Sequence, residues 1–127
     1  MGKVDGFEKL MCWQAARQLV ALTYSVCRGG LLSKDFEMSS QIRRAVLSVM
    51  SNIAEGFGRE SHKEFIRFLD ISQSSAMEVK SIAYVLEDLK YISPEQIILI
   101  MEKADEARYL TRGLMKYLRS TPKRPSP

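Results

Sequence analysis

Apolar residues recur every three or four positions in four separate segments of this chain, and that spacing is the strongest constraint on its fold. In the second segment Ile42, Val46, Val49 and Ile53 fall within about 60° of one another on a helical wheel. Alternating apolar and polar runs, which are typical of strands, do not extend beyond a few residues. The pattern predicts an all-α protein whose helices share one apolar core.

Start and stop signals set the expected bounds of the four helices. Asp5 and Glu8 have the spacing of a capping box, and the first helix is expected to end at the Gly29-Gly30 pair. The second is expected to run from about Ser39 to Phe57. Two further capping patterns predict helices over residues 61–91, opening with Ser-His-Lys-Glu, and 93–120, opening with Ser-Pro-Glu-Gln.

Short connections between long helices favour antiparallel neighbours, so the expected architecture is an up-down-up-down four-helix bundle. The 127 residues are enough for one such domain, over 1–120, followed by a flexible basic tail over 121–127. No apolar run approaches the ~18 residues of a membrane span, and the first residues lack a signal-peptide pattern. We therefore expect a cytoplasmic protein with no membrane partner.

Positive charge is concentrated at the end of the chain. Residues 1–107 carry 13 Lys and Arg against 15 Asp and Glu, whereas residues 108–127 carry six basic residues and no acid. Four of the six share an arc of about 80° on the last helix, and two follow in the tail: Arg108, Arg112, Lys116, Arg119, Lys123 and Arg124. They are the candidate phosphate-binding residues. The alternative is a solvated face whose cations suit the negative end of the helix dipole.

Aromatic residues near these cations are limited to Tyr109 and Tyr117, which lie outside the arc on the wheel. Base stacking and sequence-specific contacts are therefore expected to be weak.

Residue patterns for catalysis or metal binding are missing from the sequence. His62 is the single histidine and is interpreted as a solvated residue beside a helix cap. Cys12 and Cys27 would lie roughly 22 Å apart on one helix, too far for a disulfide, and are interpreted as buried free thiols. No phosphate-binding glycine loop occurs. We expect no enzymatic activity, no cofactor, no metal and no small-molecule substrate.

The second helix carries a polar face that allows two interpretations. Arg44, Ser48, Ser51 and Glu55 share about 60° of the wheel. Glu55 could form a polar binding site together with Gln41, Arg43 and Asn52. Alternatively, they form ion pairs and cap bonds with residues of the third helix such as Asp70 or Glu78.

Self-association is suggested by the first helix, which has a second apolar row beside the first. The row consists of Cys12, Ala15, Leu19, Leu22 and Val26. A helix in a small bundle needs about three apolar positions in seven, so the additional apolar surface could be buried against another copy of the chain. A wider core within one subunit is the alternative.

Residues 41–61, QIRRAVLSVMSNIAEGFGRES, and 63–79, KEFIRFLDISQSSAMEV, resemble the four-helix-bundle proteins encoded in bacterial ribosomal-RNA intervening sequences. Related accessory proteins of retroelements share this architecture. The residues that match the family signature, and that we interpret as structural, are Gln41, Arg44, Asn52, Glu55, Gly56, Gly58, Arg59 and Glu78.

The resemblance implies a ring, typically of five identical chains, and nucleic-acid binding is attributed to the retroelement relatives. The expected function is therefore a non-enzymatic homo-oligomer of about five chains that binds RNA or DNA non-specifically through the basic residues. The alternative is a protein–protein scaffold without a nucleic-acid role.

Overall fold

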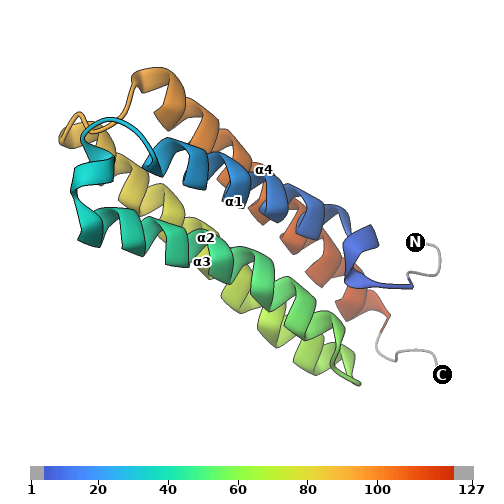
Figure 1. The fold of residues 1–127 in the computed structure, drawn as a ribbon. Helices are drawn as coiled ribbons and strands as arrows, with labels where there is room; N and C mark the ends of the chain where they lie inside the picture. The colour runs from blue at the N-terminus through green and yellow to red at the C-terminus, as the bar shows by residue number, and fades with distance from the viewer. Residues whose placement is uncertain (1–4, 122–127) are drawn as a thin grey trace.

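A computed structural model describes residues 5–121 and contains four long α-helices with no strand in that range (Figure 1). They are α1 (Met11–Cys27), α2 (Phe36–Phe57), α3 (His62–Asp88) and α4 (Pro94–Ser120). Short 3-10 turns, η1 (Phe7–Lys9) and η2 (Leu32–Lys34), precede α1 and α2. The all-α expectation is confirmed, and none of these helices is long and apolar enough to cross a membrane.

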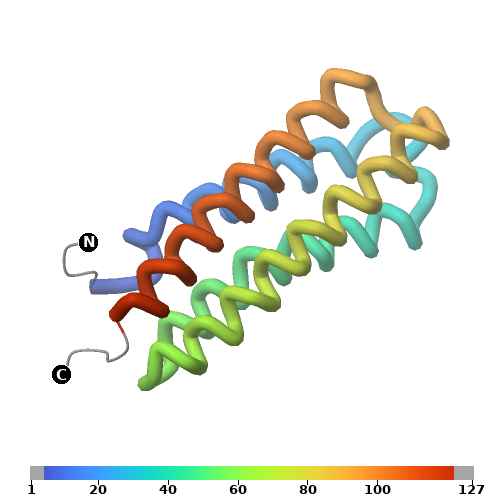
Figure 2. The backbone as a smooth tube through the Cα atoms, turned by 180° about the vertical axis from the view of Figure 1, so that it is seen from behind, coloured from blue at the N-terminus to red at the C-terminus, as the bar shows by residue number. Residues whose placement is uncertain are grey.

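The helices form an antiparallel bundle in which each packs against the next, and α4 packs back against α1 (Figure 2). The predicted four-helix architecture is thus confirmed. One end of the bundle holds η1, the α2–α3 turn and the end of α4, and we call it the terminal end. The opposite end holds the α1–α2 and α3–α4 connections, and we call it the distal end.

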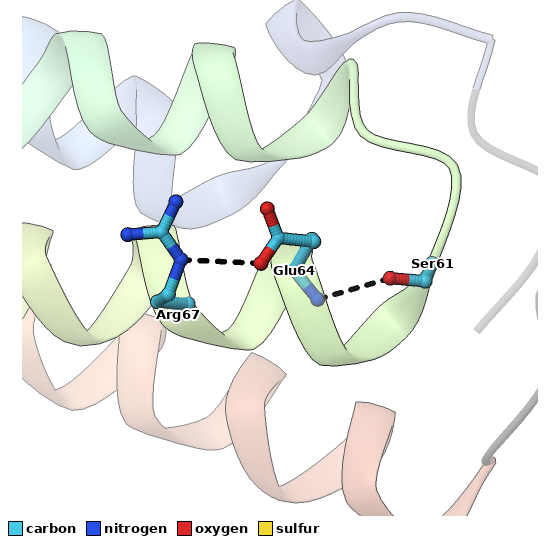
Figure 3. A network of polar contacts seen from close by, with 3 residues as sticks. All are labelled: Ser61, Glu64 and Arg67. Carbon is cyan, nitrogen blue, oxygen red and sulfur yellow. Dashed lines mark hydrogen bonds and ion pairs between the residues drawn. The ribbon is translucent and has the colours of Figure 1, made fainter.

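Helix starts that depend on local capping are where the sequence predicts them. Ser93 accepts from the Gln96 backbone N–H, and the Gln96 side chain accepts from the Ser93 N–H, so α4 has a complete capping box. Ser61 likewise caps α3 by accepting from the backbone N–H of Glu64. The Glu64 carboxylate, however, accepts from Arg67 Nε at 3.1 Å (Figure 3). This second capping box is therefore only half formed.

Two other helix starts differ from the prediction. Asp5 caps nothing, because the extended backbone at Leu10 separates η1 from α1; Leu10 is buried there, and the Phe7 ring packs on Trp13. α2 begins before Ser39, because the Asp35 carboxylate accepts from the backbone N–H of Met38. α3 also ends before Tyr91, at Asp88. The burial of Leu10 delays the start of α1, and capping by Asp35 moves the start of α2 to an earlier residue.

Hydroxyl groups join α2 to α3 inside the bundle. Ser72 donates to the carbonyl oxygen of Val49 at 2.7 Å, and the hydroxyls of Ser48 and Ser75 lie 2.7 Å apart. Ser72 and Ser75 are buried, so these hydrogen bonds satisfy groups that would otherwise be costly to remove from water.

The second apolar row of α1 is absorbed by the subunit itself. Cys12, Ala15, Leu19 and Val26 are buried, and Leu22 is partly buried against the same core. α1 contacts both α2 and α4, so it needs two apolar faces within one chain. This row is therefore no evidence for contact with a second copy of the chain, and any such contact must use other surfaces.

Candidate nucleic-acid interface

The candidate phosphate-binding residues lie along the second half of α4 at the terminal end. Arg112, Lys116 and Arg119 are exposed, and Arg108 is half-buried. All four line one open cavity of about 1430 Å³, and we call this set the α4 basic surface. Lys123 and Arg124 lie outside the described residues.

Neighbouring elements add charge that the helical wheel of α4 does not reveal. Lys9 of η1 lines the same cavity and adds a cation from 99 residues before Arg108. Asp105 and, from α3, Asp70 also line it, so the surface is not free of carboxylates. Lys80 contacts the Asp105 carboxylate at 2.7 Å and offsets its charge. Cations still outnumber carboxylates on the cavity wall, so the local field favours an anion.

Both tyrosines of α4 belong to this cavity. Tyr109 is 78% exposed and Tyr117 is 38% exposed, and both line the wall with the four cations. On the wheel they lie outside the cationic arc, but the cavity is wider than that arc because η1 and α3 border it. Gly113 lies between the two tyrosines, four residues from each, on the same wall.

Part of the family signature holds the α2–α3 turn together. A Cβ atom on Gly56 would lie 2.7 Å from Cβ of Phe68 and 2.9 Å from a ring carbon of Phe65, so only glycine fits without a shift. The Arg59 guanidinium lies 4.6 Å from the Phe68 ring centroid, a cation–π contact. These contacts give Gly56 and Arg59 a packing role.

The signature residues nearer the distal end line a small open cleft of about 320 Å³ between α2 and α3. Its wall consists of Gln41, Arg44, Ala45, Ser48 and Glu78. Among the described residues, Arg44 and Glu78 form no ion pair, although they share this wall. Asp70 instead accepts from Gln73, so the expected ion pairs of the α2 face with Asp70 or Glu78 are not formed within residues 5–121.

Asn52 and Glu55 occupy different environments, although they belong to the same signature. The Asn52 amide donates to the Ser48 carbonyl at 2.9 Å and to the Ser48 hydroxyl at 3.1 Å. Ser48 in turn contacts Ser75, so Asn52 supports the α2–α3 contact. The Glu55 side chain is exposed and has no hydrogen bond or ion pair within residues 5–121, although its backbone carbonyl accepts from the Gly58 N–H.

We expect Asn52→Ala to lower the free energy of unfolding by about 1–2 kcal/mol, since it removes hydrogen bonds from a half-buried network. Glu55→Ala should change it by less than about 0.5 kcal/mol, as is usual for an exposed side chain without partners. Urea denaturation followed by circular dichroism measures both. Equal losses from the two variants would contradict this division of the signature.

His62 is placed differently from its interpretation in the sequence. It is buried, and its ring Nδ1–H donates to the carbonyl oxygen of Thr121, which ties the start of α3 to the end of α4. Cys12 and Cys27 are buried free thiols, and burial raises the pKa of Cys12 to about 11. Within residues 5–121, His, Cys, Asp and Glu do not form a group of three or more that could hold a metal ion.

Comparison with known proteins places this arrangement in a family. The sequence profile of the 23S rRNA-intervening sequence protein family matches residues 8–113. The chain belongs to this family. A solved structure from Bacteroides thetaiotaomicron, described as a protein with unknown function from the S23 ribosomal protein family, shares 26% identity and superposes with a TM-score of 0.76. The match covers 84% of this chain and 99% of that one. Among curated proteins, none matches.

The part of this intervening-sequence protein that matches the family ends inside the α4 basic surface. Arg108 and Arg112 lie within residues 8–113, whereas Lys116, Tyr117 and Arg119 lie beyond them. The signature residues of α2 and α3 lie within the matched region. The outer half of the basic surface lies outside the matched region.

Proposed function

We propose that this chain is a non-enzymatic helical bundle that assembles with copies of itself and binds RNA or DNA through phosphate groups. The α4 basic surface carries the proposal: four cations of one helix and Lys9 line a single open cavity. Phosphates would contact Arg112, Lys116 and Arg119, which are exposed. Such contacts give affinity without sequence preference.

The buried nucleophiles support a role without catalysis. Burial raises the pKa of the Cys12 thiol to about 11, so the reactive thiolate is even scarcer at neutral pH than for an exposed cysteine. His62 is engaged with a backbone carbonyl rather than with a Ser or Cys side chain. Because the chain belongs to a family named for 23S rRNA intervening sequences, we further propose that it acts in the cytoplasm, where nucleic acid is available.

Self-assembly is supported by apolar side chains exposed at the distal end. Phe36 is 75% exposed at the start of α2. Further exposed apolar residues lie in the α1–α2 connection, at the end of α3 and at the start of α4: Leu31, Tyr84, Val85, Leu89, Ile98 and Leu99. An exposed set of this kind is typical of contact surfaces. We propose a ring of about five chains that contacts its neighbours through this end, leaving the basic terminal ends for the ligand.

Repetition in such a ring would strengthen binding. Each chain offers only a few phosphate contacts, and linked copies act on one strand at a high effective concentration. Light scattering after size exclusion should give about five times the 14.5 kDa chain mass. A monomer at micromolar concentration would show that the assembly proposal is wrong.

The test of nucleic-acid binding is its dependence on salt. With three phosphate contacts per chain and a slope of about 0.7–0.9 per contact, affinity should fall by about 1.5 decades between roughly 50 and 200 mM salt, and by more where several linked chains bind one strand. Fluorescence anisotropy with labelled RNA and DNA measures this, and the 260/280 nm absorbance ratio before and after a high-salt wash gives an independent check. If affinity does not change with salt, or if no binding is found, the protein–protein scaffold is favoured. The exposed apolar residues of the distal end are also consistent with a scaffold.

A further inference from the structure

Tyr109 is the most exposed of the large apolar and aromatic side chains among the described residues, at 78%. It lies three residues before Arg112 and seven before Lys116, on the wall of the cavity that these cations share. An aromatic ring held in water beside cations is a poor contributor to folding. It is, however, the arrangement by which proteins bind single strands, with bases stacked on aromatic rings and phosphates on basic residues.

Gly113 is a second, independent feature of the same wall. It lies inside α4, where glycine is about 0.8–1 kcal/mol less favourable than alanine. Within residues 5–121, a Cβ atom built on it would meet nothing within 4 Å, and its backbone is not in the left-handed region. Neither packing nor backbone conformation therefore requires glycine at this position.

The position of Gly113 gives it a different use. Tyr109, Gly113 and Tyr117 follow one another at intervals of four residues, about 6 Å of helix each. The missing side chain leaves bare helix between two rings that line the same cavity. A flat group can approach the backbone there, whereas a longer side chain would fill the space.

We propose that this row binds the bases of single-stranded nucleic acid. Tyr109 and Tyr117 stack on bases, Gly113 leaves room for a base between them, and Arg112 and Lys116 bind the adjoining phosphates. The proposal depends on the phosphate-binding function above and specifies its ligand as a single strand. A duplex is excluded because its bases are already stacked on one another. Stacking tolerates any base, so the lack of sequence preference is retained.

Binding of labelled oligouridylate, oligothymidylate and a duplex of about twelve units to the full chain tests the proposal, and the two single strands distinguish RNA from DNA. Tyr109→Ala should weaken single-strand binding about 5- to 150-fold, and duplex binding by less than about two-fold. Tyr109→Phe should bind like the wild type, because the ring is sufficient. The matched control is Met77→Ala, which removes a 45%-exposed apolar side chain on α3 outside the cavity and outside the proposed subunit contact, and should change neither affinity.

Substitutions at Gly113 separate binding from folding. Gly113→Ala should raise the melting temperature by a few degrees, and Gly113→Gln should not lower it, because both are better helix formers than glycine. Gly113→Gln should nevertheless weaken single-strand binding by at least five-fold, because its side chain fills the space between the rings. If Gly113 had a purely structural role, both substitutions would lower the melting temperature, and Gly113→Gln would leave single-strand binding unchanged.

The possible failures are distinguishable. If Tyr109→Ala and Gly113→Gln bind single strands as tightly as the wild type while binding remains salt-dependent, the stacking proposal is overturned and phosphate binding stands. A duplex that binds more tightly than either single strand overturns it as well. A changed oligomer mass in Tyr109→Ala would identify the ring as a subunit contact and would also overturn it.

Discussion

Replacing Arg112, Lys116 and Arg119 together with Glu is expected to abolish nucleic-acid binding, with a loss of at least about 100-fold at roughly 50 mM salt. The three exposed cations would become three carboxylates on a wall that already carries Asp70 and Asp105. Each lost phosphate contact removes a released counterion, and each new carboxylate repels the strand. Anisotropy titrations of the variant and the wild type in the same buffer measure the change.

Folding should survive this change. The three side chains are exposed and form no ion pair within the described residues, so their replacement costs little packing. Only Arg119 lies in the last turn of α4, where a carboxylate opposes the helix dipole by about 0.3–1 kcal/mol. Helicity and oligomer mass should therefore remain those of the wild type.

A matched control distinguishes binding at the α4 basic surface from an effect of net charge on affinity. Arg28, Lys34 and Lys90 are exposed cations at the distal end, and their joint replacement with Glu changes the net charge by the same amount. Because these residues lie at the end that we propose to contact neighbouring chains, light scattering first checks that the variant keeps the wild-type oligomer mass. At equal oligomer mass this control should keep most of the affinity, because its charges lie beyond a Debye length of about 10 Å from the α4 basic surface at about 0.1 M salt. Equal losses in the two variants would show that net charge, not this surface, drives binding.

The sequence predicts best the features that depend on neighbouring residues. The Ser93-to-Gln96 capping box is encoded within four positions, and α4 begins where that pattern requires. The start of α2 is harder to predict, because the Asp35 carboxylate accepts two hydrogen bonds from different parts of the chain. One carboxylate oxygen caps α2, and the other accepts from the Tyr91 hydroxyl, 56 residues away. Such a contact has no local signal.

The candidate site shows the same limit. A helical wheel is sufficient to align the four cations of α4, because they share one helix. It cannot bring in Lys9 or Asp70, which reach the cavity from η1 and α3. It aligns Asn52 with Ser48, four residues earlier on α2, but it cannot show that Ser48 contacts Ser75 of α3 or that the Glu55 side chain has no hydrogen bond or ion pair within residues 5–121. The contact between Ser48 and Ser75 depends on the packing of α2 on α3.

The same packing makes Gly56 the most sensitive position of the signature to a single methyl group. Gly56→Ala should lower the free energy of unfolding by about 1–3 kcal/mol, the usual cost of overfilling a well-packed contact. The new Cβ would lie 2.7 Å from Cβ of Phe68 and 3.3 Å from the carbonyl oxygen of Phe65. Neither atom is the end of a flexible side chain, so α2 and α3 must move apart. Thermal denaturation should show a melting temperature lower by several degrees.

Gly58→Ala is the control for this prediction, because it adds the same methyl group two residues later. Its Cβ would make an ordinary contact, 3.5 Å from the carbonyl oxygen of Glu55, and Gly58 has φ of −77°, which any residue adopts. We expect a change within about 0.5 kcal/mol. Alanine improves helix propensity at Gly56 by up to about 1 kcal/mol, which opposes the clash. A Gly56→Ala variant as stable as Gly58→Ala would therefore mean that α2 and α3 separate at little cost, contrary to the close contact at Phe68.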